Sequence, residues 1–228
     1  KVAQTNLARV DATASVKETM RKLNQQFGEV RKTTTHAETL EGSQGVLSLE
    51  EALATPDAAW DLRETRFKVQ ALRDLDVSMS AEADKLMKLA VDGDATAADA
   101  FLDTALIAAA LGNKNRMTGT GAGQLLEARK ILADADRAGQ STTDLAALVE
   151  RLAGEGVTRM EDIARLKAQL LAEGIDGMRL AQMMAQLPAR GQHALMRKAW
   201  EAYKTSNDAL HWLYINFLLG PVSHAANV

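Results

Sequence analysis

The chain has 228 residues, of which 46% are hydrophobic but only 4% are aromatic, and its formal net charge is -3. Because acids and bases are interspersed along the sequence, the charge gives no basis for binding duplex nucleic acid. The absence of cysteine excludes disulfides and thiolate metal sites. Alanine and leucine dominate the apolar residues and only three prolines occur, which together favour an all-α fold. No apolar run approaches the roughly 18 residues of a membrane-spanning helix, so we expect none.

The first predicted region, residues 1–55, is a segment of small helices. Residues 1–14 lack clear periodicity and are expected to be partly extended. Ser15 begins a capping-box pattern, and Gly28 is expected to end the helix that follows. The apolar stripe of that helix consists of Val16, Met20, Leu23 and Phe27. A second capping box at residues 48–51 predicts another short helix.

Residues 56–138 are predicted to form a long antiparallel helical hairpin. Pro56 is expected in the first turn of a helix that continues to residue 91, because no glycine or proline interrupts this stretch. Gly93 lies between two aspartates and predicts the turn, with Asp94 capping the second helix over residues 95–138. Each helix of the hairpin would be about 50 to 60 Å long at 1.5 Å per residue.

The last region, residues 139–228, is expected to be a cluster of short helices. Thr142 or Thr143 begins one helix, and a third capping box at residues 158–161 begins another. Asp176 is expected to cap a helix that Pro188 ends. A capping pattern at Ser223 is cut off by the end of the sequence, so we expect the chain to be truncated after residue 228 and to belong to a longer protein.

A run of glycines interrupts the second helix of the predicted hairpin. Gly119, Gly121 and Gly123 resemble a phosphate loop superficially, but the run lacks a preceding strand, a following Lys-Ser/Thr pair and the GxGxxG spacing. The sequence favours a thin helix face that another helix approaches closely, or a local kink. Each glycine costs about 1 kcal/mol of helix propensity, so this is the weak point of the hairpin.

Other residues that could carry chemistry do not form recognisable sites. The four histidines have no helical metal-ligand spacing, and the acids around Gly93 are too few for a calcium loop. Nothing marks a paired cleft among the acids near the N-terminus, as a muramidase would need; these are Glu38, Glu41, Glu50 and Glu51. We therefore predict no catalytic residue, no metal site and no cofactor.

An aromatic cluster lies near the end of the sequence and has two interpretations. Its members are Trp200, Tyr203, Trp212, Tyr214 and Phe217. As part of a core, Trp212 and Phe217 would face helices between residues 178 and 200. As an interfacial segment, the cluster would lie at a membrane surface, although its polar face is poor in Lys and Arg.

The residues after this cluster resemble a known motif. The stretch from Phe217 to Asn227 reads FLLGPVSHAAN and is similar to an LLSGPxTHxxN signature that follows a Trp, here Trp212. That signature belongs to large phage-encoded proteins that are packaged inside the virion and ejected with the DNA. The residues that carry the resemblance are Trp212, Gly220, Pro221, Ser223, His224 and Asn227.

Weaker likenesses to the same family extend along the chain. Residues 5–11 look like its NLxxIxxxxDV entry, residues 31–41 have the shape of its RRGxxSHEET segment, and residues 60–131 look like its long hairpin. The chain departs from the family at four positions. Leu219 replaces a Ser, Ser223 replaces a Thr, and Gly121 and Gln124 stand where the family has Glu and Arg.

The resemblance implies a structural, non-enzymatic role in virion assembly and in DNA passage across the host envelope. The implied location is the virion, and then the host cell envelope after ejection. The implied partners are further copies of the chain and other virion proteins such as portal or tail components, with possible contact to the host membrane and without sequence-specific nucleic acid binding. The alternative hypothesis is a helical accessory domain attached to a cell-wall lytic enzyme or a polymerase outside this fragment.

Self-association is also expected from the slender shape of the hairpin, which buries little surface per residue. The apolar run Ala108, Ala109, Ala110 and Leu111 is the face that we expect to pack against another copy or another virion protein.

Overall fold

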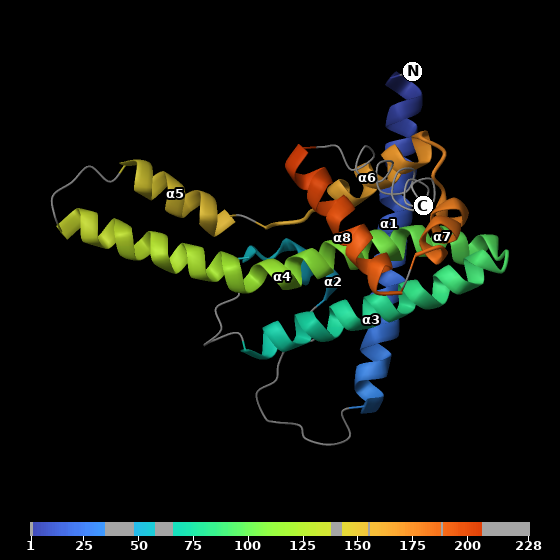
Figure 1. Cartoon of the computed structure of the whole chain (residues 1–228), viewed down its shortest axis with the longest axis horizontal. Helices are drawn as coiled ribbons and strands as arrows, with labels where there is room; N and C mark the ends of the chain where they lie inside the picture. The colour runs from blue at the N-terminus through green and yellow to red at the C-terminus, as the bar shows by residue number, and fades with distance from the viewer. Residues whose placement is uncertain are drawn as a thin grey trace, which may run out of the picture.

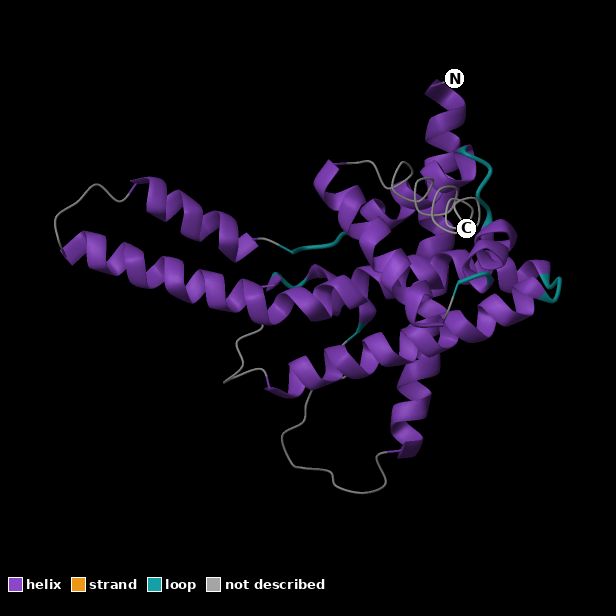
Figure 2. Cartoon of the chain, viewed as in Figure 1, coloured by secondary structure: helices purple, strands orange, loops and turns teal. Residues whose placement is uncertain are grey.

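The computed structural model describes residues 2–34, 48–57, 66–137, 143–154, 156–187 and 189–206. All the regular secondary structure of these residues is helical (Figure 2), which confirms the predicted all-α fold. The helices are α1 (Val2–Thr34), α2 (Leu49–Ala54), α3 (Arg66–Val91), α4 (Ala95–Arg137), α5 (Thr143–Gly154), α6 (Met160–Ala172), α7 (Gly177–Ala185) and α8 (Ala189–Ser206).

Helices α3 and α4 form the predicted antiparallel hairpin (Figure 1). The chain reverses at Gly93, whose φ of 101° lies in the left-handed region that glycine adopts without strain. Asp94 then caps α4, since its Oδ1 accepts a hydrogen bond from the Ala97 N–H at 2.9 Å. The turn and its cap are therefore where the sequence predicts them.

The start of the hairpin lies partly outside the described residues. Pro56 follows α2, whose C-cap is Thr55 in an extended conformation, with φ of -72° and ψ of 127°, as expected for a residue before proline. Asp57 is in a 3-10 conformation, and the predicted continuation of the helix through residues 58–65 lies outside the described residues. The described part of α3 begins at Arg66.

The N-terminal region also differs from the prediction. Residues 2–14 are helical, and α1 runs through Ser15 and Gly28 to Thr34 without a break. Ser15 is no helix cap, because its hydroxyl donates a hydrogen bond to Asp103 of α4 instead. Burial of Ala12 shows that the apolar stripe begins before residue 15, so packing continues the helix where local periodicity is weak.

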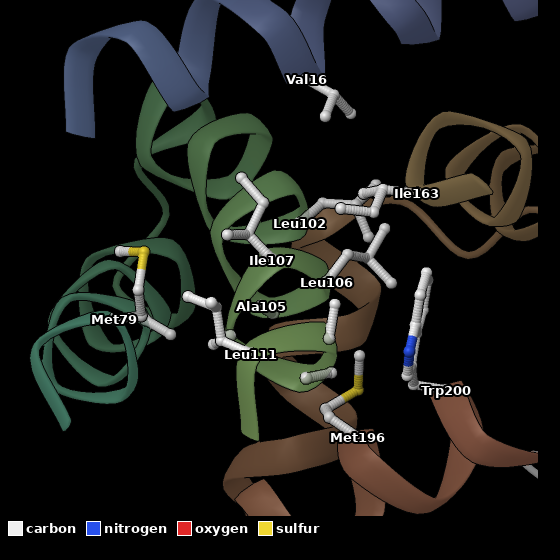
Figure 3. Packing of buried hydrophobic residues seen from close by; sticks show 14 of the residues in the cluster. Val16, Met79, Leu102, Ala105, Leu106, Ile107, Leu111, Ile163, Met196 and Trp200 are labelled. Carbon is white, nitrogen blue, oxygen red and sulfur yellow. The ribbon is translucent and has the colours of Figure 1, made fainter. Parts of the chain in front are cut away.

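Helix α4 is the centre of the fold. Every residue from 101 to 112 is buried, and apart from Asp103 and Thr104 this stretch is apolar on all sides, as expected of a helix in an interior. Figure 3 shows Leu102, Leu106 and Leu111 of α4 between Met79 of α3 and Trp200 of α8. Helices α1, α2, α3, α4, α6, α7 and α8 contribute side chains to this one core cluster.

One stretch of α4 is apolar enough to cross a membrane by length and composition alone. This stretch, Ala95–Thr118, contradicts our expectation of no such run, because alanine-rich sequence accumulates hydropathy without an obvious apolar block. In the folded chain 78% of its most apolar window is buried by the other helices.

The short helices of the C-terminal region begin close to the predicted positions. The described part of α5 begins at Thr143, and Asp176 caps α7 by accepting the Arg179 N–H at 2.8 Å. The cap of α6 is Arg159 and not Thr158, because Asp162 accepts the Arg159 N–H at 3.2 Å. Helix α7 ends at its C-cap Gln186, and Pro188 lies outside the described residues.

Two features extend beyond the central bundle in Figure 1. Helix α1 runs across the hairpin with both ends projecting, and it packs on α6, α4 and α2. The distal part of α4 leaves the bundle with α5 packed along it, and we call this pair the arm, residues 119–137 with α5. The arm is thus a two-helix extension of a helical core.

Candidate functional site

The motif that carries the family resemblance lies outside the described residues. This holds for Trp212, Gly220, Pro221, Ser223, His224 and Asn227, and equally for Phe217. Upstream of the motif, the aromatic cluster does enter the core. Trp200 is 1% exposed and Tyr203 is 5% exposed, and their ring centroids lie 5.6 Å apart with the planes tilted by 40°. The core interpretation is confirmed for these two aromatics.

The glycine run does not break α4. The backbone at Gly119, Gly121 and Gly123 is helical, so the helix is continuous there, while their surroundings lie outside the described contacts. The close helix approaches that the structure describes occur at two other glycines. A Cβ on Gly177 would overlap the Ala98 carbonyl of α4, and a Cβ on Gly112 would lie 2.7 Å from Cδ of Arg197 in α8. The sequence does not predict these close approaches, because an isolated glycine has no pattern around it that indicates a neighbouring helix.

A buried polar cluster joins α1, α4 and α6, and we call it the Asp103 cluster. The Lys167 Nζ lies 2.6 Å from Asp103 Oδ1 and donates to Ser15 Oγ at 2.8 Å. Hydroxyls of Ser15 and Thr19 donate to Asp103 Oδ2 at 2.7 and 2.9 Å. Ser15 and Thr19 are one helical turn apart, so a single face of α1 supplies both donors.

A second buried cluster surrounds Lys114 of α4, and we call it the Lys114 cluster. The side chain is 1% exposed; its Nζ lies 3.2 Å from Asp57 Oδ1 and donates to the Gly156 carbonyl at 2.7 Å. Burial lowers the pKa of Lys114, while the charge and hydrogen bond of Asp57 act in the opposite direction and Lys204 adds to the lowering.

The chain segment before α6 is fastened at the Lys114 cluster. Gly156 has a φ of 85°, and a Cβ there would overlap the Asp57 carboxylate, so both its conformation and its space require glycine. The Thr158 N–H donates to the Leu53 carbonyl at 2.9 Å. The Lys204 Nζ donates to the Val157 carbonyl at 3.2 Å. Four regions of the sequence therefore meet here.

Both clusters are suited to holding helices in register. Their charged groups are almost fully buried and paired, so an outside molecule has no access to them in this conformation. Leaving either charge unpaired in the interior would be strongly destabilising, which fixes one arrangement of the helices. Among the described residues, no group of three or more His, Cys, Asp or Glu is placed to hold a metal ion.

The acids that we considered for acid/base chemistry do not meet in a described cleft. Glu38 and Glu41 lie outside the described residues. Glu50 is exposed and accepts a hydrogen bond from Asn24 at 2.6 Å, and Glu51 lies in the first turn of α2, where its N–H binds the Ser48 hydroxyl. Ser48 is thus the helix cap that the sequence predicts.

The apolar face expected to mediate self-association is not available. Ala108, Ala109, Ala110 and Leu111 are 6%, 2%, 1% and 0% exposed, because they fill the core of their own chain. The large apolar side chains that are exposed in the described residues are scattered over several helices, and two of them lie on the arm, where Leu126 is 60% and Ile131 is 48% exposed.

Comparisons of this chain with protein-family models, with curated proteins and with solved structures find no match.

Proposed function

We propose that the chain is a structural, non-enzymatic region of a phage internal virion protein. In this role it is packaged inside the particle and ejected with the genome to help the DNA cross the host envelope. The observation that carries the proposal is the FLLGPVSHAAN stretch after Trp212, which resembles the signature of that family. Its assembly partners would be further copies of the chain and portal or tail components.

The described helices support a scaffold role by the way they are fastened. The Asp103 cluster joins residues that are far apart in the sequence. Ser15 and Asp103 are separated by 88 positions, and Ser15 and Lys167 by 152. The Lys114 cluster joins α4 to two other segments: Asp57, which follows α2, and Gly156, which lies between α5 and α6. Such buried polar contacts favour one helix arrangement over others, which an assembly component requires.

The arm supports the same role because it offers a surface for partners. Leu126 and Ile131 expose apolar side chains on a helix pair that extends from the bundle (Figure 1). In this proposal the arm contacts another copy or another virion protein.

Mass spectrometry of purified particles tests the proposal. Particles would be induced from the strain that encodes the chain, and divided into filled particles and particles emptied by triggered ejection. We expect peptides from residues 1–228 in filled particles and their depletion from emptied ones. Peptides found in lysates but absent from filled particles would contradict the proposal. A parent protein with cell-wall lytic or polymerase activity, absent from the virion, would favour the accessory-domain alternative.

A further inference from the structure

A charged groove lies between α3, α4 and α8. This open groove has a volume of about 450 Å³, within the range of about 300 to 1,000 Å³ that is usual for small-molecule sites. Its described lining consists of Arg73, Asp76, Gly112, Asn115, Arg116, Arg197, Lys198 and Glu201. Four of these side chains are basic and two are acidic.

Gly112 shapes the floor of this groove. It stands at the end of the fully buried stretch of α4, where glycine costs about 1 kcal/mol of helix propensity relative to alanine. The space that a Cβ would fill is taken by Arg197, whose Cδ and Cγ lie 2.7 and 3.2 Å from that position. The stem of Arg197 therefore lies directly on the α4 backbone, and Arg197 lines the groove.

The acids of the groove are already engaged. Asp76 Oδ2 accepts a hydrogen bond from Asn115 Nδ2 at 2.9 Å, and Glu201 pairs with Arg116 at 2.9 Å. Within the described residues, Arg73 and Arg197 make no hydrogen bond or ion pair. Two arginines without a described ion pair thus line one groove, beside an Asp76 carboxylate whose described partner is a neutral amide.

We propose that this groove binds a small phosphate monoester whose body carries hydroxyl groups. The planar guanidinium of arginine donates two parallel hydrogen bonds to phosphate oxygens, and two arginines balance the charge of a dianionic monoester. The Asp76 carboxylate binds Asn115 through Oδ2, so its second oxygen, Oδ1, can accept a hydrogen bond from a ligand hydroxyl beside the phosphate. This inference does not depend on the virion role proposed above.

The same lining argues against a nucleic acid strand. The described lining contains no aromatic side chain on which a base would stack. Asp76 and Glu201 would repel the further phosphates of an extended polyanion. A single compact anion satisfies both arginines without bringing more negative charge to the acids.

Isothermal titration calorimetry at low ionic strength tests the inference on the full chain. The probes are glycerol 3-phosphate, inorganic phosphate, glycerol and a short single-stranded DNA. We expect saturable binding of glycerol 3-phosphate, weaker binding of inorganic phosphate, and none of glycerol. Arg73→Met and Arg197→Met should each weaken glycerol 3-phosphate binding by at least about tenfold, since each removes a charge-assisted contact. Methionine keeps most of the arginine stem, so packing over Gly112 is largely retained.

Arg165→Met is the matched control, because Arg165 is an exposed arginine of α6 that lines a different hollow. It removes the same charge and should leave binding unchanged. In the wild-type chain, titration with glycerol 3-phosphate should also shift the backbone amide signals of Gly112 and Asn115, which needs no variant to fold. Absence of saturable binding would overturn the proposal. Equal weakening by all three variants, or tighter binding of the DNA, would also overturn it.

Discussion

Lys167 of α6 and Asp103 of α4 form an ion pair of 2.6 Å whose side chains are only 9% and 1% exposed. Ser15 and Thr19 of α1 complete the shell of hydrogen bonds around it. A buried ion pair stabilises little by itself, since the desolvation of both charges opposes their attraction. Its effect is to penalise arrangements in which either charge loses its partners, so it selects the crossing of α1 over α4 and α6.

Lys167→Met is expected to destabilise the chain by about 3 to 5 kcal/mol, because it leaves the Asp103 carboxylate buried without a counter-charge. Chemical denaturation followed by circular dichroism measures this free energy of unfolding. The control is the double variant Lys167→Met with Asp103→Leu, which removes both charges and should recover most of the loss. A single variant as stable as the parent would contradict the role of the pair.

The pH dependence of stability tests the Lys114 cluster. Burial lowers the pKa of Lys114 below its ordinary value of 10.5, so the folded chain releases this proton at a lower pH than the unfolded chain. Between the lowered folded pKa and 10.5, the unfolded state binds more protons, and stability therefore rises with pH.

The reference for this measurement is the double variant Lys114→Met with Asp57→Asn, which removes the buried pair. The free energy of unfolding of the parent minus that of this variant should increase as pH rises toward 10.5. Urea denaturation at several alkaline pH values gives both curves. A difference that is flat or falls with pH would show that Lys114 is not desolvated in the folded chain.

Two glycines that lie against other helices should respond differently to alanine. Gly177→Ala should destabilise by about 1 to 3 kcal/mol, because the new Cβ would overlap the Ala98 backbone carbonyl, which has no freedom to move alone. Gly112→Ala meets the flexible stem of Arg197, and the gain of about 1 kcal/mol in helix propensity offsets much of that contact. The melting temperature of Gly177→Ala should therefore be lower than that of Gly112→Ala in thermal unfolding experiments. The reverse order would contradict the described approach of α7 to α4.

The elements that the sequence predicts well are those with a local cause. The turn at Gly93 and the caps Asp94, Ser48 and Asp176 each follow from residues that are neighbours in the chain. These signals depend on backbone conformation and capping, which act over a few residues.

The predictions that fail are those in which distant residues override a local signal. Ser15 has a capping pattern but binds Asp103, 88 positions away. Thr158 also begins a capping pattern, but its N–H donates to the Leu53 carbonyl, and the N-cap of α6 is Arg159. The buried clusters were not predicted either, because nothing local distinguishes Lys114 or Lys167 from a solvated lysine.

The arm should determine self-association if it is the contact surface in our proposal. Leu126→Glu and Ile131→Glu place charges on side chains that are 60% and 48% exposed, so they should leave the fold intact. We expect both to lower the average molar mass seen by light scattering across a concentration series. Val77→Glu is the matched control, because Val77 is a 70% exposed residue of α3 outside the arm. A parent chain that stays monomeric throughout the series would contradict the prediction.

The two tryptophans Trp200 and Trp212 distinguish a core role of the terminal segment from a membrane role. Trp200 is 1% exposed, and Trp200→Ala should cost about 3 to 5 kcal/mol and lower the melting temperature markedly. If residues 207–228 join the same core, as we predict from the apolar stretch after His211, Trp212→Ala should lower the melting temperature by a comparable amount. Differential scanning calorimetry of both variants, with vesicle co-sedimentation in parallel, separates the cases. A Trp212→Ala chain that melts like the parent but no longer binds lipid vesicles would show that this segment contacts membranes, and that its predicted packing is wrong.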